Sequence, residues 1–146
     1  MARLMYTRIL VPLDHSRYDA AILAHVRRLA RLTGARLLLI HVADGFVARN
    51  VEQLKLRESA EIRSDREYLE RETTALCDEG FDAESLLAAG EPAKEITAAA
   101  SGEGCDLIAM ATHGHRGLKD LLYGSVANEV RHLSRVPVLL VRGDAP

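Results

Sequence analysis

The sequence of 146 residues predicts a single α/β domain over 1–146, in which helices cover both faces of an open, five-stranded parallel sheet. Two patterns carry this prediction. Five short apolar runs are nearly continuous, as is typical of strands that are buried on both faces. Segments with helical periodicity separate these runs, and strict alternation of strands with helices favours a parallel sheet.

The boundaries of the elements follow from these patterns. Strands are expected at 9–13, 36–42, 84–89, 106–111 and 136–141, and helices at 17–33, 54–79, 91–104 and 125–134. Ser16 and Asp19 resemble a capping box at the start of the first helix, and Gly34 suits its end. Pro92 favours a helix start near 91. The last helix is expected to begin at Gly124-Ser125, and residues 43–53 are expected to form a loop.

Composition excludes several classes of protein. The formal charge of −2 disfavours a broad nucleic-acid-binding surface, and an aromatic content of 4% without tryptophan disfavours base-stacking platforms. No apolar run approaches the roughly 20 residues that span a bilayer. Arg8 and Asp14 interrupt any signal-peptide core. The two cysteines lack metal-ligand spacing. We therefore expect a cytoplasmic domain that binds neither nucleic acid nor membrane.

The ends of two predicted strands carry unusual chemistry. In open parallel sheets, ligands bind beyond the carboxyl ends of the strands, where the strand order reverses. The first strand ends in Pro12-Leu13-Asp14, and the fourth continues into the glycine-containing loop 111–117, which leads to Gly124-Ser125. Asp14 is a lone carboxylate that suits a ribose hydroxyl or a metal ion carried by phosphates.

The segment 111–125 has the properties of a phosphate site. Gly114 and Gly124 lack the Cβ atom that would keep the backbone away from a ligand. The first amides of a helix at Ser125 would be unpaired and would attract a phosphate. Positive or hydrogen-bonding groups lie nearby in the sequence, at His113, His115, Arg116 and Lys119.

Other interpretations of the same residues remain open. Gly124-Ser125 also fits a simple helix start, and Gly114 and Gly117 also fit turns. The His113-Gly-His115 pattern lacks a third ligand for a metal site. The sequence has no P-loop, no G-x-G-x-x-G after the first strand, no nucleophile elbow and no carboxylate pair at the strand ends. We therefore assign no catalytic residue.

Taken together, these segments resemble the universal stress protein family. Its nucleotide-binding branch carries glycine, two residues, glycine, nine residues, and then Gly-Ser or Gly-Thr. Here Gly114 and Gly124-Ser125 match this spacing, and Ala111 replaces the first glycine. The flanking segments ILVPLDHS, LLLIHVAD, AAGEPAKEI and GSVANEVRHLSRVPVLLVR match as well, so the resemblance covers nearly the whole chain apart from 44–80.

The resemblance implies a Rossmann-like sheet of the adenine nucleotide alpha-hydrolase type, with strand order 3-2-1-4-5. It also implies a site at the reversal point, where Asp14 would hold the ribose. The backbone of Val42 and the neighbourhood of Pro12 and Met110 would enclose the adenine, and Leu13 is also expected among the cofactor-binding residues. The loop with Ala111, His113, Gly114, His115 and Arg116 would lead to the phosphates, which Gly114, Gly124, Ser125, Val126 and Ala127 would cradle.

The implied function is that of a cytoplasmic ATP-binding protein, a nucleotide-responsive regulatory or binding module in stress response. ATP or another adenine nucleotide would bind with or without Mg²⁺, and two chains would pair through residues 136–141, an apolar edge strand that Pro137 suits. A further protein partner is left open. One alternative is a slow ATP hydrolase or adenylyl-transferring enzyme aided by Asp14 or His113. The other is a nucleotide-free interaction protein, which the glycine spacing disfavours.

Overall fold

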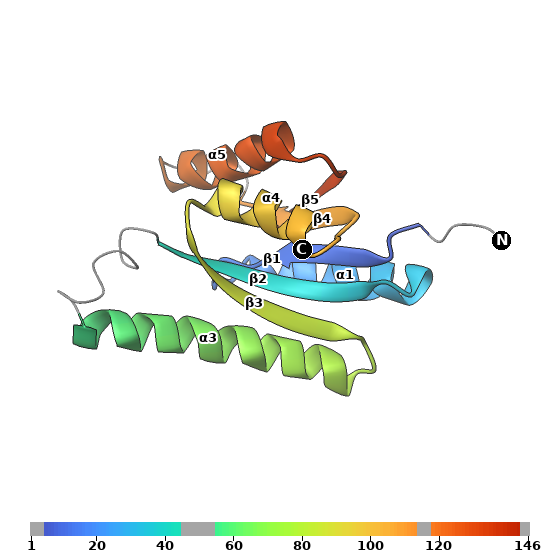
Figure 1. The fold of residues 1–146 in the computed structure, drawn as a ribbon, viewed down its shortest axis with the longest axis horizontal. Helices are drawn as coiled ribbons and strands as arrows, with labels where there is room; N and C mark the ends of the chain where they lie inside the picture. The colour runs from blue at the N-terminus through green and yellow to red at the C-terminus, as the bar shows by residue number, and fades with distance from the viewer. Residues whose placement is uncertain (1–4, 45–54, 114–117, 144–146) are drawn as a thin grey trace.

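The computed structural model of the chain describes residues 5–44, 55–113 and 118–143. Strands and helices alternate within it (Figure 1). The elements are β1 Arg8–Pro12, α1 Asp19–Thr33, β2 Arg36–Asp44, α3 Lys55–Asp78, β3 Ala83–Gly90, α4 Pro92–Gly102, β4 Leu107–Thr112, α5 Leu118–Leu133 and β5 Val138–Arg142. None of the helices in this part of the chain is both long and apolar enough to cross a membrane.

The strands form a five-stranded, entirely parallel sheet in the order β3-β2-β1-β4-β5. The predicted fold class and the implied strand order are therefore confirmed. The order reverses between β1 and β4, which pair directly through Ile9 with Leu107 and Leu10 with Ile108. The carboxyl ends of these two strands consequently lie side by side.

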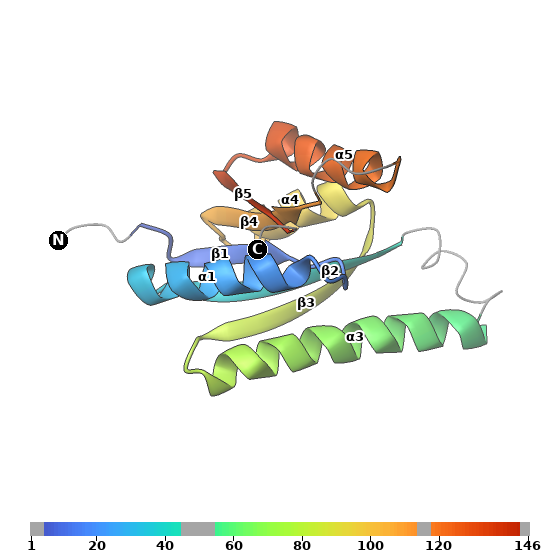
Figure 2. The ribbon, with the colours of Figure 1, turned by 180° about the vertical axis from the view of Figure 1, so that it is seen from behind.

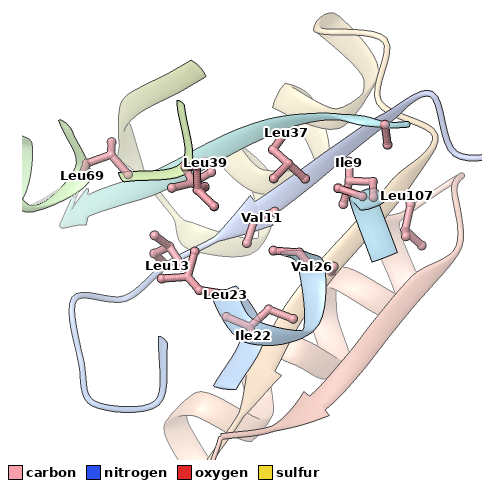
Figure 3. Packing of buried hydrophobic residues seen from close by; sticks show 14 residues of the cluster. Ile9, Val11, Leu13, Ile22, Leu23, Val26, Leu37, Leu39, Leu69 and Leu107 are labelled. Atoms are coloured by element: carbon pink, nitrogen blue, oxygen red, sulfur yellow. The ribbon is translucent and has the colours of Figure 1, made fainter. Parts of the chain in front are cut away.

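Two apolar layers explain why the strands are continuously hydrophobic. Ile9 and Val11 of β1 pack with α1 and α3 on one face of the sheet, whereas Leu10 packs with α4 and α5 on the other. All three side chains are fully buried. Figures 1 and 2 show the helix pairs on opposite faces, and Figure 3 shows Val11 and Leu13 directed toward α1.

Two helix starts differ from the sequence expectation. The helix α1 begins at Asp19 and not at residue 17, because Ser16 and Asp19 close a separate turn in front of it. In that turn the amide of Tyr18 donates to the Ser16 hydroxyl, and the amide of Ser16 donates to the Asp19 carboxylate. Of the two reciprocal contacts of a capping box, the one from the Ser16 amide to the Asp19 carboxylate forms, but the Asp19 amide donates to the Ser16 carbonyl and not to its hydroxyl. These contacts shape the turn that follows β1 and do not cap α1.

The second difference concerns α5. The sequence placed its start at Gly124-Ser125, but the helix begins at Leu118, six residues before Gly124. Residues 118–123 (LKDLLY) contain three leucines and a lysine, which favour helix. A glycine inside a helix costs only about 1 kcal/mol relative to alanine, so the helix continues through Gly124.

Candidate functional site

A cavity of about 120 Å³ lies at the carboxyl ends of the central strands, where the strand order reverses. Eight of the residues predicted for the site line it together. They are Pro12, Leu13, Asp14, Val42, Met110, Ala111, His113 and Val126. Four further lining residues were not predicted for the site: Asp19, Ile40, Pro92 and Ile96.

Most of the cavity wall is apolar. Ile40, Ile96 and Met110 are buried side chains that belong to the core layer beneath α4 and α5. Such a wall can contact a flat hydrophobic ring, but its apolar side chains provide no hydrogen bonds that would orient the ring. The carboxylates of Asp14 and Asp19 and the ring of His113 provide polar atoms in the lining.

Asp14 and His113 form a pair between the ends of β1 and β4. The Nε2 atom of His113 lies 2.7 Å from Oδ2 of Asp14, and the Ser16 hydroxyl donates to Oδ1. The His113 ring is buried and packs against the ring of Tyr18, with 4.1 Å between centroids. The Asp14 side chain keeps 32% of its surface exposed. It is therefore fixed in position and still accessible.

Asp19 holds the turn that carries Asp14. Its carboxylate is only 3% exposed and accepts the amide hydrogens of Asp14, His15 and Ser16 at 3.0–3.3 Å. The hydroxyl of Tyr68 donates to the same carboxylate at 2.6 Å. Burial raises the pKa of Asp19, the Tyr68 hydrogen bond opposes that rise, and the nearby charge of Asp14 adds to it, so that the net pKa is about 6. Asp19 is thus a buried carboxylate whose pKa is held above the ordinary range of an aspartate.

The helix α3 reaches the same turn through Asp65. One oxygen of this carboxylate lies 2.7 Å from Nδ1 of His15, and the other lies 3.3 Å from Nε2 of His41. The other ring nitrogen of His41 is 2.8 Å from the carbonyl oxygen of Leu13. The ring of His15 stacks on Tyr68 with 4.1 Å between centroids. His41 of β2 therefore holds the backbone at Leu13, and Asp65 of α3 holds the side chain of His15, on the two sides of Asp14.

The remaining predicted residues lie elsewhere. Ala127 is buried in the core layer that faces α4 and α5. Gly114, His115 and Arg116 lie outside the described residues. Gly124 and Ser125 lie within α5 and not at its start. Because only the first four amides of a helix lack a partner within it, the expectation of unpaired amides at Gly124-Ser125 is not met here.

Sequence reasoning missed Asp19 as part of the site and interpreted it only as a helix cap. The sequence shows no carboxylate pair at the strand ends, and the structure adds Asp19 from the first turn of α1, which accepts the amide hydrogen of Asp14 at 3.2 Å. The signal was present in the sequence, since Asp19 follows Asp14 by five residues across a turn. In the described parts of the chain, no group of three or more histidine, cysteine, aspartate or glutamate residues could hold a metal ion.

Comparison with known proteins agrees with the fold. The model of the universal stress protein family matches residues 5–142. The universal stress protein MJ0577 of Methanocaldococcus jannaschii is 32% identical over 158 residues, covering 94% of this chain and 96% of its own. The universal stress protein YxiE of Bacillus subtilis is also 32% identical, covering 94% of this chain and 100% of its own.

Solved structures show the same fold. The structure of MJ0577 superposes with a TM-score of 0.82 at 33% identity, covering 94% of this chain and 96% of that one. A universal stress protein from Archaeoglobus fulgidus, solved in complex with dAMP, superposes with a TM-score of 0.69 at 19% identity. It covers 96% of this chain and 100% of that one.

Proposed function

The chain belongs to the universal stress protein family, and we propose that it is an ATP-binding member, which acts in the cytoplasm as a nucleotide-responsive regulatory or binding module in stress response. One observation carries this proposal. The cavity at the reversal point combines an apolar wall with the accessible carboxylate of Asp14. An adenine nucleotide needs both features, one for its base and one for its ribose.

The ribose would bind to Asp14. A carboxylate offers about four acceptor positions. The Ser16 hydroxyl and the His113 ring occupy two of them. The positions that remain suit the two neighbouring hydroxyls of a ribose, and the base would then extend between Val42 and Met110 toward the apolar wall.

The phosphates would extend from the cavity toward α5. In this proposal Gly114, His115 and Arg116 supply amides and positive charge, and Mg²⁺ accompanies ATP. Val126 lies on α5 and lines the cavity, so that this helix contributes to the cavity wall. Contact with the amides of Gly124 and Ser125 would require the first turns of α5 to rearrange, because the helix begins at Leu118.

A second copy of the chain would pair along β5. This strand lies at the edge of the sheet, and its Leu140 side chain is 37% exposed. An exposed apolar edge strand invites pairing with another chain. Sedimentation velocity of the wild type and of Leu140→Lys tests this arrangement, which fails if both sediment as monomers.

The proposed binding is tested by calorimetry with ATP and Mg²⁺, and with AMP alone. We expect the wild type to bind. Asp14→Ala should lose about tenfold to a hundredfold in affinity, because a hydrogen-bonded charge contributes about 1.5–3 kcal/mol. Asp82→Ala is the matched control, since it removes an exposed carboxylate at the other end of the sheet. Absence of binding to both nucleotides overturns the proposal and favours a nucleotide-free interaction protein.

Slow ATP hydrolysis is the second candidate. The observation in its favour is the pairing of His113 with Asp14 in the cavity lining, since a histidine oriented by a carboxylate can accept a proton from water. Turnover above background that disappears in His113→Gln, while ATP still binds, supports hydrolysis. Equal turnover in both proteins rejects a role for His113.

A further inference from the structure

Tyr68 lies on α3 and contacts the site from outside. Its hydroxyl donates to Oδ2 of Asp19 at 2.6 Å, the shortest of the hydrogen bonds that the structure gives this carboxylate. Burial raises the pKa of Tyr68, and the contact with Asp19 raises it further, so the hydroxyl keeps its proton. Tyr68 is therefore a permanent donor to Asp19.

The hydrogen-bond partners of Asp19 favour its ionised form, whereas burial favours its protonated form. Oδ1 accepts the amide hydrogen of Asp14, and Oδ2 accepts those of His15 and Ser16. Each of these partners is a donor, and so is the Tyr68 hydroxyl. A protonated Asp19 would have to place its own hydrogen on an acceptor, and the fold places beside it the carboxylate of Asp14, whose own amide donates to Asp19 at 3.2 Å.

The two protonation states therefore have opposite effects on Asp14. When Asp19 is ionised, it holds the 14–16 turn by three amides and leaves the Asp14 carboxylate to other donors. When Asp19 is protonated, it donates to Asp14 and takes an acceptor position that a ribose hydroxyl would use. The proton state of Asp19 thus controls how much of Asp14 a ligand can reach.

We propose that Tyr68 is a positioning residue of the nucleotide site, whose hydroxyl keeps Asp19 ionised so that the turn stays ordered and Asp14 remains available to the ribose. This inference rests on the proposed function, because it takes Asp14 as the ribose acceptor. It adds a residue from α3, a helix that lies on the opposite face of the sheet from the apolar wall of the cavity.

Other titratable groups surround this pair. The turn contributes Asp14 and His15, and α3 contributes Asp65 and Glu72, whose charge raises the pKa of Tyr68. Arg71, also on α3, places its guanidinium carbon 5.7 Å from the centroid of the Tyr68 ring. His41 of β2 and His113 after β4 are further titratable groups nearby. His15 in the turn and His41 in β2 both face Asp65, whereas His113 faces Asp14. Tyr68 is the side chain that donates to Asp19 itself.

The consequence is a pH dependence that Tyr68 sets. Burial raises the pKa of Asp19, and the Tyr68 hydrogen bond opposes that rise, so that the net pKa is about 6. Nucleotide affinity should therefore fall as the pH drops through about 6. Without the hydroxyl, the loss should begin at higher pH.

The test is Tyr68→Phe, which keeps the ring and removes only the donor. Affinity for ATP and for AMP is measured by calorimetry between pH 5 and pH 8. We expect the pH midpoint of the loss of nucleotide affinity to move up by about one pH unit in Tyr68→Phe. The affinity of this variant should be nearly that of the wild type at pH 8 and about fivefold weaker at pH 6. The phosphates of the nucleotide titrate equally in both proteins, so the difference belongs to the protein.

Tyr6→Phe is the matched control, since Tyr6 packs partly buried against the same core cluster but precedes β1, whereas Asp19 follows the carboxyl end of that strand. This substitution should leave the pH midpoint of nucleotide affinity at its wild-type value. An unchanged midpoint in Tyr68→Phe overturns the inference. A loss of affinity that is equal at every pH also overturns it, because Tyr68 would then act through packing alone.

A carbon-13 NMR titration of the Asp19 carboxyl without nucleotide separates this inference from the proposed function. A higher midpoint in Tyr68→Phe than in the wild type supports control of Asp19 by Tyr68, and equal midpoints reject it. If the wild type binds neither nucleotide at pH 8, the proposed function and the role of Tyr68 in it both fall. The NMR result then still decides whether Tyr68 keeps Asp19 ionised.

Discussion

The two ends of β1 are each held by an aspartate that accepts backbone amides. At the amino end, Asp106 accepts the amide hydrogens of Thr7 and Arg8 at 2.8 and 3.1 Å. At the carboxyl end, Asp19 accepts three amides from the turn after the strand. Burial would raise the pKa of Asp106 as well, but there the hydrogen bonds together outweigh it and the pKa is lowered. The pKa of Asp19 is raised instead.

The surroundings explain this contrast. Near Asp106 the charges are exposed or paired, as in the bridge of 2.9 Å between Arg8 and Glu84. Around Asp19 the hydrogen bonds come from amides and one hydroxyl, the side chain is 3% exposed, and a second carboxylate lies close by. The amino end is arranged for stability alone. The carboxyl end keeps a buried charge at a cost, which is typical of functional sites.

The largest expected effect is on the free energy of unfolding, which the buried charge of Asp19 lowers as the pH rises. Because the native state raises the pKa of Asp19 from 3.8 to about 6, it binds the proton more tightly than the unfolded chain. The contribution of Asp19 to the free energy of unfolding is therefore greatest below pH 4 and falls by about 3 kcal/mol as the pH rises to 6 and above. Asp19→Asn cannot titrate and should lack this fall.

Urea unfolding at pH 4, 5, 6 and 7 measures the difference. Asp106→Asn is the control, because the lowered pKa of Asp106 gives the opposite sign: its contribution is lost only as the pH falls below the ordinary aspartate value of 3.8. Between pH 4 and pH 7 its profile should therefore run parallel to that of the wild type. If Asp19→Asn and the wild type show parallel pH profiles, the two ends of β1 are electrostatically alike and the contrast drawn above is wrong.

The fold was predictable because its cause is local in the sequence. Ile9, Leu10 and Val11 are consecutive and apolar because they point alternately into two buried layers, and this repeats in every central strand. The start of α5 was not predictable from the same rules. Gly124-Ser125 looks like a helix start, but the leucines that precede it extend the helix to Leu118.

The site was predictable where its residues follow strands directly. Asp14 comes two residues after β1 and His113 comes one residue after β4, and the sheet brings them together. Tyr68 and Asp65 could not be found in this way. They lie inside α3, a predominantly polar helix of 24 residues, and only its packing decides which of its side chains reach the turn after β1.

A smaller effect is expected from Asp106→Ala, which removes the acceptor for two amides and the Thr7 hydroxyl. These donors lie where water can replace the carboxylate, so the free energy of unfolding should fall by about 1–2 kcal/mol at neutral pH. Nucleotide affinity at pH 8 should stay within twofold of the wild type. A loss of affinity comparable to that of Asp14→Ala would show that the two ends of the sheet are coupled.

The smallest effect is expected from the bridge between Arg36 and Asp82 at the amino end. Nε of Arg36 lies 3.0 Å from Oδ2 of Asp82, but the two side chains are 51% and 61% exposed. Solvent screening should limit their coupling to about 0.2–1 kcal/mol. Arg36 also lies 3.7 Å from Glu84, so a double-mutant cycle with Arg36→Ala and Asp82→Ala is needed to isolate the pair. The coupling should shrink further in 1 M salt. A coupling well above 1 kcal/mol that persists in 1 M salt would show that charges at the amino end are also shielded from water. Solvent exposure of the charged side chains would then not explain the difference between the two ends of β1.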